Sequence, residues 1–340
     1  MATIYEVSKL AGVSLATVSR VMNNNANVSD ATRKKVTAAM DELGYRPNSI
    51  AQSLASNCSN SVGLLVSELQ GPFYGPMMSG IENTFRNQGK HLIIAAGHSD
   101  EEREKQGIEF LISRNCDGLI LHVEAVSDDY LIKLSKGRTP FVLINRYIGE
   151  LSDRCILLNN IKGGYLAAKH VLEQGHKNIA YISGPLWKQD AKDRLEGHKQ
   201  ALAEFNLEFD ENLLFQGDFM EASGYEGLKA LHQQTHPFTA LICANDEMAV
   251  GAMASARDLG LTLPKQLSIM GYDNVFFTRH VYPQLSTVNY PIDEMGRMAA
   301  DWVLNHVYQK QTPPLQTLFE PELIVRHSIS RQSAQITSQG

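Results

Sequence analysis

The feature that most constrains the fold is a series of short apolar runs that alternates with helix-like stretches across residues 60–270. The first four runs are Val62–Val66, Leu92–Ala96, Gly118–Leu121 and Phe141–Ile144. After Ile156–Leu158 the same spacing is repeated by Ile179–Ile182, Leu213–Phe215, Ala240–Cys243 and Ser268–Met270, with helical patterns at Tyr165–Gln174, Arg194–Phe205 and Glu247–Leu259. Such runs are typical of parallel strands that are buried on both faces. The sequence therefore predicts an α/β fold with two similar lobes, each a parallel sheet flanked by helices.

The N-terminal segment has a different, all-helical pattern. Apolar residues lie at helical spacing over residues 4–11, and Gly12 then supplies the permissive backbone that a tight turn requires. Ser14 is a suitable N-cap for a second helix over residues 15–22, and a third helix begins at Ser29. Two short helices joined by a glycine indicate a helix-turn-helix, although this pattern alone is equally compatible with a small helical subdomain.

The distribution of charge favours a nucleic-acid partner for this segment. The whole chain has a formal net charge of −6, which by itself argues against binding to phosphates. Residues 1–60, however, contain six basic and four acidic side chains, so they carry +2 and leave −8 on the other 280 residues. This asymmetry is typical of a small DNA-facing head on an acidic body.

Motifs in the N-terminal segment resemble those of the lactose/galactose repressor family of transcriptional regulators. They are Ala11-Gly-Val-Ser-Leu-Ala-Thr-Val-Ser-Arg-Val21, Val28-Ser, Thr32-Arg33, Gly44-Tyr-Arg-Pro-Asn48 and Ala51-Gln-Ser-Leu54-Ala, and the resemblance extends over nearly the whole chain. It implies an N-terminal all-α helix-turn-helix domain and a two-lobed body like that of periplasmic binding proteins. The expected boundaries are 1–46 for the helix-turn-helix domain, 47–58 for a hinge helix and linker, and 59–340 for the effector-binding and dimerisation body. Within the body, the N-lobe comprises 59–160 plus 292–322, and the C-lobe comprises 161–291 plus 323–330.

The resemblance also implies which residues contact DNA. The second helix enters the major groove with Leu15, Ala16 and Arg20 toward the base edges. The resemblance places five residues near phosphates: Ser14, Thr17, Ser19, Asn23 and Thr32. It also implies that Asn48 binds DNA. Arg20 can donate two hydrogen bonds to a guanine, whereas Leu15 and Ala16 offer only apolar contact. In this family a leucine at the position of Leu54 wedges into the minor groove from a hinge helix too short to be stable alone; the alternative is an ordinary apolar linker residue.

Polar and aromatic side chains follow the predicted strands, at the sheet edge where ligands of open parallel sheets bind. They are Phe73, Tyr74, Asn145, Arg146, Arg194, Phe219, Asn245, Asp246, Asp273 and Asn274. Amides, carboxylates and guanidinium groups can pair with adjacent hydroxyls, and an aromatic face can stack on a sugar ring, so the set predicts a sugar site. Asn245 or Asp246 alone could do no more than cap the next helix.

The resemblance supports this effector site and narrows the ligand. Positions matching Arg194, Phe219, Asn245 and Asp273 line the effector cleft in relatives. The motifs most similar to the galactose-repressor branch are Val142-Leu-Ile-Asn-Arg146, Ala244-Asn-Asp246, Ile269-Met-Gly-Tyr-Asp-Asn274 and Leu323–Ile329. Departures are Asn145, where relatives for other sugars carry Asp, and His98 and Trp187 near the cleft. The expected effector is therefore a galactose-like hexose or a glycoside.

These features together predict a repressor of sugar-utilisation genes that a sugar releases from operator DNA. The sign of the coupling stays open, because a corepressor such as a purine would use the same parts; a sugar-binding module without DNA function is a further alternative. Tyr282–Pro291 resembles the family segment that packs between subunits, and residues 331–340 lack the leucine heptads that form tetramers. We expect a homodimer on a near-palindromic operator.

Other function classes find no support in the sequence. A dinucleotide-dependent enzyme would carry GxGxxG after the first strand, where Ser67–Phe73 has none, and no nucleophile with its base can be assembled. We therefore expect no catalysis and no cofactor. The cysteines, far apart and without CxxC spacing, predict thiols rather than a metal site or disulfides; they are Cys58, Cys116, Cys155 and Cys243. Residues 1–25 lack a signal-peptide pattern and no run is long enough to span a bilayer, so we expect a cytoplasmic protein without a membrane partner.

Overall fold

The computed structural model describes residues 2–22, 28–46 and 58–332. The chain divides into two compact units, a head (Met1–Asn60) and a body (Ser61–Gly340). Three residues expected to contact DNA, Asn23, Asn48 and Leu54, lie outside the described residues, as does nearly all of the expected hinge segment. Among the described residues, no helix is both long and apolar enough to cross a membrane.

The head contains the three helices that the sequence predicts. They are α1 (Ile4–Ala11), α2 (Leu15–Met22) and α3 (Asp30–Glu42). Local caps fix their ends: Gly12 ends α1 in the left-handed conformation at φ 65°, and the Ser14 hydroxyl accepts a hydrogen bond from the Thr17 amide at 3.2 Å. Ser29 caps α3 in the same way. Their apolar faces meet in a small core that includes Val7, Val18, Val21, Val36 and Ala39.

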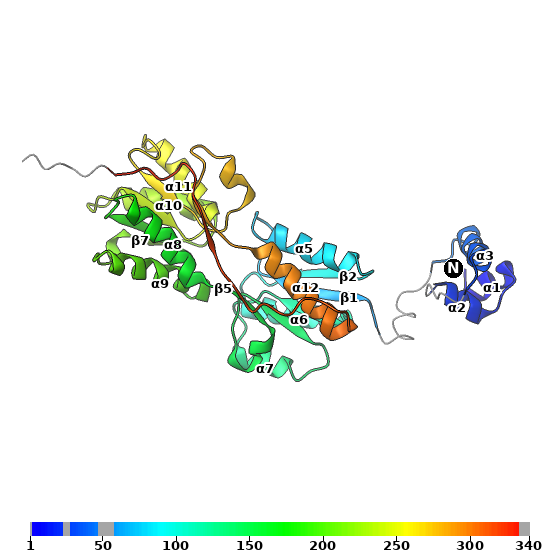
Figure 1. The fold of residues 1–340 in the computed structure, drawn as a ribbon. Helices are drawn as coiled ribbons and strands as arrows, with labels where there is room; N and C mark the ends of the chain where they lie inside the picture. The colour runs from blue at the N-terminus through cyan, green and yellow to red at the C-terminus, as the bar shows by residue number, and fades with distance from the viewer. Residues whose placement is uncertain (1, 23–27, 47–57, 333–340) are drawn as a thin grey trace, which may run out of the picture. The chain divides into compact units, whose positions relative to one another are not determined.

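The N-lobe of the body is built on a parallel sheet with strand order β11-β5-β4-β3-β1-β2 (Figure 1). Its strands are β1 (Ser61–Val66), β2 (His91–Ala96), β3 (Gly118–Leu121), β4 (Phe141–Ile144), β5 (Cys155–Leu158) and β11 (Leu318–Phe319). Its helices are α5 (Tyr74–Arg86), α6 (Glu101–Ser113), α7 (Asp128–Leu134) and α12 (Ile292–Tyr308). Strands β3 and β4 are buried throughout, which is why they appear in the sequence as unbroken apolar runs.

The C-lobe repeats this plan around a parallel sheet with strand order β7-β6-β8-β9. Its strands are β6 (Ile179–Ser183), β7 (Leu214–Gln216), β8 (Ala240–Cys243) and β9 (Ser268–Met270). Its helices are α8 (Asn160–Glu173), α9 (Gln189–Glu204), α10 (Glu221–His232) and α11 (Asp246–Asp258). Helices α8 and α9 each begin five residues earlier than expected; the side chain of Asn159, which accepts from the Lys162 amide at 3.1 Å, starts α8.

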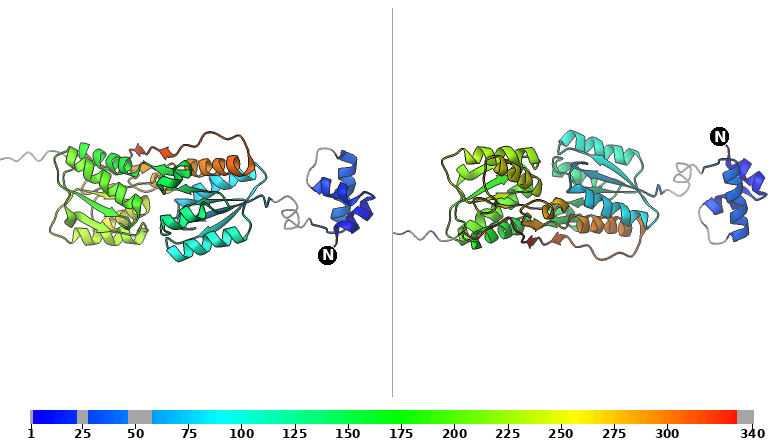
Figure 2. Two further views of the ribbon diagram at one scale, coloured as in Figure 1. Left: turned by 90° about the horizontal axis from the view of Figure 1, so that it is seen from below. Right: turned by 90° about the horizontal axis from the view of Figure 1, so that it is seen from above.

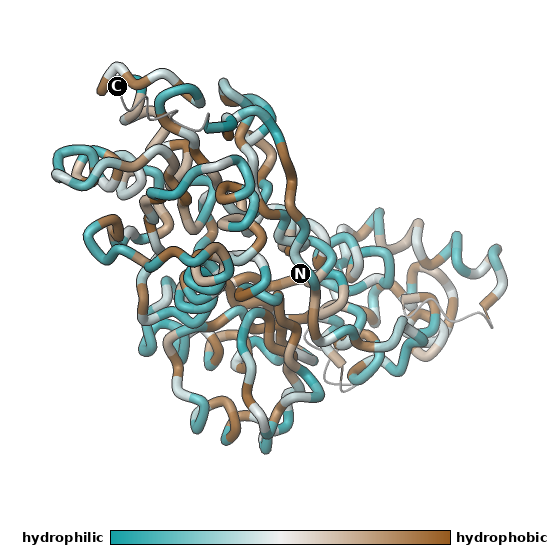
Figure 3. The backbone as a smooth tube through the Cα atoms, turned by 60° about the vertical axis from the view of Figure 1, so that its left-hand side comes forward, coloured by the Kyte–Doolittle hydropathy of each residue, from teal (hydrophilic) through white to brown (hydrophobic). Residues whose placement is uncertain are grey.

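The chain passes between the lobes three times, and these crossings hold the two sheets with their carboxyl ends toward each other. The first crossing follows β5, the second follows β10 (Thr287–Asn289) and the third follows β11. The third crossing leads into β12 (Glu322–Ile324), which pairs antiparallel with β10. Short 3₁₀ helices occur at Gly149–Arg154, Glu211–Leu213 and Phe276–Arg279. Figure 2 shows helices on both faces of each sheet, and Figure 3 shows hydrophobic and hydrophilic stretches alternating along the backbone. The fold is the two-lobed α/β body that the sequence predicts.

Candidate functional site

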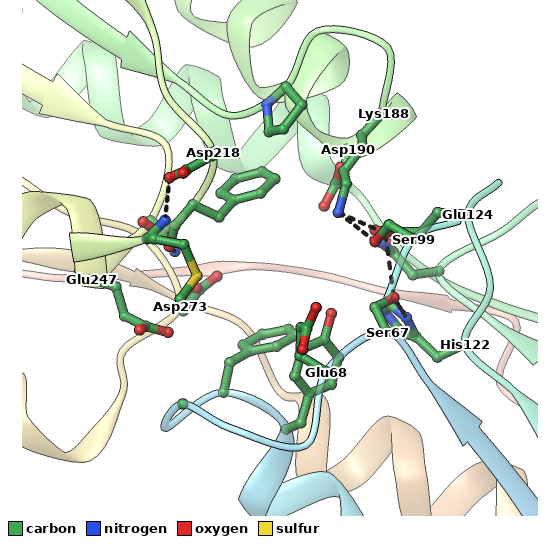
Figure 4. A pocket seen from close by; sticks show the side chains of 18 of the residues that line it. Ser67, Glu68, Ser99, His122, Glu124, Lys188, Asp190, Asp218, Glu247 and Asp273 are labelled. Carbon is green, nitrogen blue, oxygen red and sulfur yellow. Dashed lines mark hydrogen bonds and ion pairs between the residues drawn. The ribbon is translucent and has the colours of Figure 1, made fainter. Parts of the chain in front are cut away.

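A cleft of about 350 Å³ lies between the two lobes, at the carboxyl ends of both sheets. Every one of the eight strands β1–β4 and β6–β9 delivers at least one residue to it from the loop that follows, as expected for open parallel sheets. The N-lobe wall comes from residues 67, 68, 70, 71, 73, 74, 98, 99, 122, 124 and 145, and the C-lobe wall from residues 185, 187, 188, 190, 194, 218–220, 245, 247 and 273. Figure 4 shows charged side chains from both walls pointing into this space. We call it the inner cavity.

Arg194, on the first turns of α9, is held by several contacts in the C-lobe wall. Its Nε donates to Asn160 Oδ1 at 3.0 Å and its Nη1 to the carbonyl oxygen of Ala244 at 2.6 Å. Its guanidinium carbon lies 3.9 Å from the centroid of the Tyr272 ring, within the range of a cation–π contact. Burial disfavours the charge, but neighbouring Asp273 raises the pKa of Arg194, so the group stays cationic. A ligand in the cleft meets a fixed guanidinium.

Asp273, directly across from this guanidinium, carries an acceptor without a hydrogen-bond partner. Its Oδ1 lies 3.5 Å from Arg194 Nη1, too far for a hydrogen bond, and accepts none from any described residue. Burial raises the pKa of Asp273 well above its usual value, against the opposing effect of Arg194. Its backbone φ of 105° is one that L residues rarely adopt. A buried polar atom left unpaired is costly, so a hydroxyl donated by a ligand would stabilise this arrangement.

Asn245 and Phe219 complete the C-lobe wall. The Asn245 side chain caps α11 by accepting from the Met248 amide at 2.9 Å and donates to the Phe219 carbonyl oxygen at 2.8 Å. It therefore both caps a helix and lines the cleft, so capping does not exclude a role in the site. Phe219 has φ 71°, and its ring packs directly on Gly184, where any Cβ would collide with it. Because Gly184 has no side chain, the Phe219 ring can lie in this position, near the Arg194 guanidinium.

One ion pair joins the two walls. Lys188, just before α9 in the C-lobe, places its ammonium 2.6 Å from Glu124 Oε2 of the N-lobe and 3.0 Å from Ser99 Oγ. The two charged side chains are only 13% and 12% exposed. Burial disfavours the charged carboxylate, but the Lys188 ammonium holds the pKa of Glu124 below its usual value. The pair is therefore ionised and closes part of the cleft, as the dashed lines in Figure 4 show.

The head offers a separate polar surface on α2. Ala16, Ser19 and Arg20 are exposed there, whereas Val18 and Val21 face the core. Leu15 is half-buried. Ser14 and Thr17 hydrogen-bond to each other at 2.9 Å, as do Ser29 and Thr32, so these hydroxyls also serve as caps. The exposed face of α2 is free to meet base edges, with Arg20 its one basic side chain.

Comparison with known proteins places both units in one family. Residues 3–48 match the bacterial regulatory proteins of the lacI family, and residues 168–329 match a periplasmic binding protein-like domain. The chain is 39% identical over 333 residues to the HTH-type transcriptional regulator GalR of Escherichia coli, covering 98% of this chain and 97% of that protein. The chain belongs to the lacI family.

Other lacI-family proteins are similar over the same length. The HTH-type transcriptional repressor PurR of Proteus mirabilis is 34% identical, covering 97% of each chain. The crystal structure of the Lac repressor dimer bound to operator and an anti-inducer superposes with a TM-score of 0.85 at 28% identity, covering 97% of this chain and 99% of that one. The sequence-based assignment to this family of regulators is confirmed.

In this lacI-family chain, seven of the ten side chains expected in the effector site line the inner cavity. They are Phe73, Tyr74, Asn145, Arg194, Phe219, Asn245 and Asp273. His98 and Trp187, noted as departures, line it too. The other three do not: Asp246 and Asn274 are corrections, and Arg146 lines a neighbouring cavity.

Asp246 points into the core of the C-lobe instead of the cleft. Its carboxylate accepts from the Thr287 hydroxyl at 2.7 Å and the Val275 amide at 2.9 Å, and burial raises its pKa to about 7. Asn274 is held by Arg326 and Asn289, also away from the cleft. Arg146 pairs with Asp128 and lines a neighbouring cavity. Asp246 and Asn274 therefore have a structural role, because they connect the loops after β8 and β9 to β10.

Several cleft residues were not anticipated from the sequence. They include Glu68, His122, Glu124, Lys188, Asp190 and Asp218. His122 directly follows β3, and its Nδ1 lies 3.2 Å from Ser67 Oγ; burial lowers its pKa, so the ring is neutral. The signal was available, since inspecting the residues after Gly118–Leu121 and Ile179–Ile182, as was done for other strands, would have found His122 and Lys188.

Proposed function

We propose that this protein is a dimeric repressor that binds operator DNA through α2 and is released by a sugar bound in the inner cavity. The observation that carries the proposal is the combination, in one cavity, of a fixed guanidinium on Arg194, an unpaired acceptor on Asp273 and the aromatic face of Phe219. Vicinal hydroxyls pair with the first two groups, and the apolar face of a sugar ring stacks on the third.

The comparisons support the sugar over a purine. GalR of Escherichia coli is more similar to this chain than the PurR proteins, at 39% against 34% identity. A solved relative described as a complex of the regulator CelR with cellobiose is 31% identical, with a TM-score of 0.70. We therefore assign the effector to the carbohydrates, with a hexose unit in the inner cavity as the recognised element. Because its target is DNA, the protein acts in the cytoplasm.

The coupling follows from where the ligand sits. Both lobes contribute to the inner cavity, so a ligand there changes the relative stability of open and closed arrangements of the body. If the two arrangements differ in how well a dimer holds its heads on two half-sites, sugar affinity and operator affinity are linked, typically by about 1–3 kcal/mol. Exposed Tyr282 lies in the segment that we propose packs between subunits.

The experiment combines operator selection with sugar titration. Full-length protein is used to select binding duplexes from a random pool, and fluorescence anisotropy then gives operator affinity with and without galactose, glucose and their glycosides. We expect one sugar to weaken operator binding at least tenfold. Arg20→Ala should weaken operator binding by about 10- to 100-fold, the loss of one bidentate base contact, without changing sugar affinity. Lys9→Ala, on α1, serves as the control for loss of one positive charge in the head.

Two results would refute the proposal. Operator affinity that is unchanged by every sugar, with sugar binding itself demonstrated, would remove the regulatory link. Equal operator binding by Arg20→Ala and the unmodified protein would show that α2 does not enter the groove.

A further inference from the structure

A second cavity, of about 670 Å³, adjoins the inner cavity between the same two lobes. We call it the outer cavity. It is lined by residues after β4 and β5, by the start of α9 and by Leu318 of β11. Five residues line both cavities: Glu124, Asn145, Trp187, Lys188 and Asp190. The two spaces are therefore neighbours that share this set of side chains, which we call the partition.

The partition contains the ion pair that joins the lobes. Lys188 and Glu124 face each other at 2.6 Å, and Asn145 adds an amide held by Asn160 at 3.4 Å. Each of these groups can exchange a hydrogen bond within the wall for one with a ligand oxygen. A ligand that passes from one cavity to the other would meet a polar, adjustable passage at this point.

The outer cavity has the chemistry of a carbohydrate site. Tyr147 and Trp187 are 62% and 52% exposed, unusually high for large aromatic rings in a concave surface. Around them lie amides and carboxylates from Asn159, Gln189 and Asp193. Exposed aromatic faces beside planar hydrogen-bonding groups suit a ring with one apolar face and a hydroxylated rim.

Arg146 is only partly satisfied by hydrogen bonds within the protein. Its Nη2 and Nε donate to Asp128 Oδ1 at 2.7 and 3.3 Å. Its Nη1 is buried and has no hydrogen-bond partner among the described residues. A buried donor left unpaired is costly, and here it belongs to a side chain that lines the outer cavity.

We propose that the outer cavity is a second sugar subsite, so that the effector is a disaccharide with one ring in each cavity and its glycosidic linkage beside Lys188 and Glu124. This deepens the proposed function and depends on it, because the first ring occupies the inner cavity. It also assigns a role to Arg146 and Tyr147. The discrimination between a disaccharide and its component hexose then lies in residues outside the inner cavity.

Isothermal titration calorimetry on the full-length protein tests this with galactose, glucose, lactose, melibiose and cellobiose. At least one disaccharide should bind at least about tenfold more tightly than either of its component hexoses. In Tyr147→Ala that advantage should fall by about tenfold, while the affinity for the hexose changes less than twofold. Arg146→Gln should act in the same direction. Phe110→Ala, which removes an exposed ring of α6 that lines neither cavity, should change neither affinity.

The outcomes separate this inference from the function on which it rests. A hexose that binds as tightly as every disaccharide overturns the second subsite and leaves the sugar-responsive repressor intact. Equal losses of hexose and disaccharide affinity in Tyr147→Ala also overturn it, because Tyr147 would then serve the inner cavity. Failure of all five sugars to bind overturns both. Because Tyr147 is exposed, its truncation should leave the melting temperature of the free protein unchanged, which identifies any misfolded variant.

Discussion

The two walls of the inner cavity are built differently, and the difference indicates how recognition and movement are divided between the lobes. On the C-lobe wall, Arg194, Asn245 and Asp273 are buried and are fixed by contacts within their own lobe. On the N-lobe wall, His98 is exposed and Glu68 is half-buried. Glu124 accepts from Ser67 and Ser99 of its own lobe, but its charge partner, Lys188, belongs to the opposite lobe. A preorganised wall favours affinity, because little conformational entropy is lost when the ligand binds. A wall whose charged group pairs with the opposite lobe stabilises the arrangement in which the two lobes are close together.

The largest expected effect comes from removing the fixed cation. Arg194→Met should destabilise the protein by about 3–5 kcal/mol, because it removes the buried cation beside Asp273 and leaves the oxygens of Asn160 and Ala244 without their donor. Binding of every sugar should be lost as well. Urea denaturation and calorimetry measure the two effects, and Arg86→Met, which removes an exposed arginine paired within α5, is the matched control with an expected change below about 1 kcal/mol. An equally small effect at both positions would show that the C-lobe wall is not preorganised.

A second prediction concerns pH and the helix that carries Arg194. His198, one turn further along α9, packs between the rings of Tyr181 and Phe209, and neither of its ring nitrogens has a hydrogen-bond partner among the described residues. Burial lowers its pKa to about 3, so the folded protein holds the ring neutral. The unfolded chain takes up a proton below pH 6.5, and stability is therefore lost as the pH falls from 6.5 toward 3.

Replacement of this imidazole should remove that dependence. At pH 5, His198→Phe should be more stable than the unmodified protein by about 2 kcal/mol, and at pH 7.5 no less stable. Urea titrations at the two pH values measure the difference. His176 is a matched buried histidine whose ring nitrogens are paired with Thr239 and Ser330, so His176→Phe should destabilise at both pH values. A pH profile unchanged by His198→Phe contradicts the prediction.

The ion pair across the cleft should give a smaller, coupled effect. In a double-mutant cycle with Lys188→Met and Glu124→Gln, each single change leaves a charge without its partner, and the double change leaves none. We expect a coupling free energy of about 1–3 kcal/mol in urea denaturation. The exposed pair Lys162–Glu320, which has nearly the same N–O distance of 2.8 Å, should couple by less than about 0.5 kcal/mol. Simple additivity at Lys188 and Glu124 would mean that the two walls are not tied together.

The contrast between local and long-range contacts also explains what could be predicted from the sequence. The starts of α2 and α3 were predicted, because the N-caps Ser14 and Ser29 act through residues only three positions away. Strands of the body were found because burial on both faces produces apolar runs. Asn245 and Asp246 show the limit: they are adjacent and similar, yet one lines the cleft and the other bonds to Thr287, 41 positions away. Nothing local distinguishes them.

The smallest expected effect on stability concerns the N-lobe wall of the inner cavity. On the N-lobe wall, His98 Nδ1 lies 3.0 Å from Glu68 Oε2, but the two side chains are 44% and 36% exposed, so solvent weakens this contact. His98→Gln should therefore change the free energy of unfolding by no more than about 0.5 kcal/mol, while sugar affinity falls by up to about tenfold through the loss of one hydrogen bond in the cleft. Urea denaturation and calorimetry give the two values. A stability loss above about 2 kcal/mol, accompanied by unchanged sugar affinity, would make His98 a structural residue, and the N-lobe wall would then be as fixed as the wall it faces.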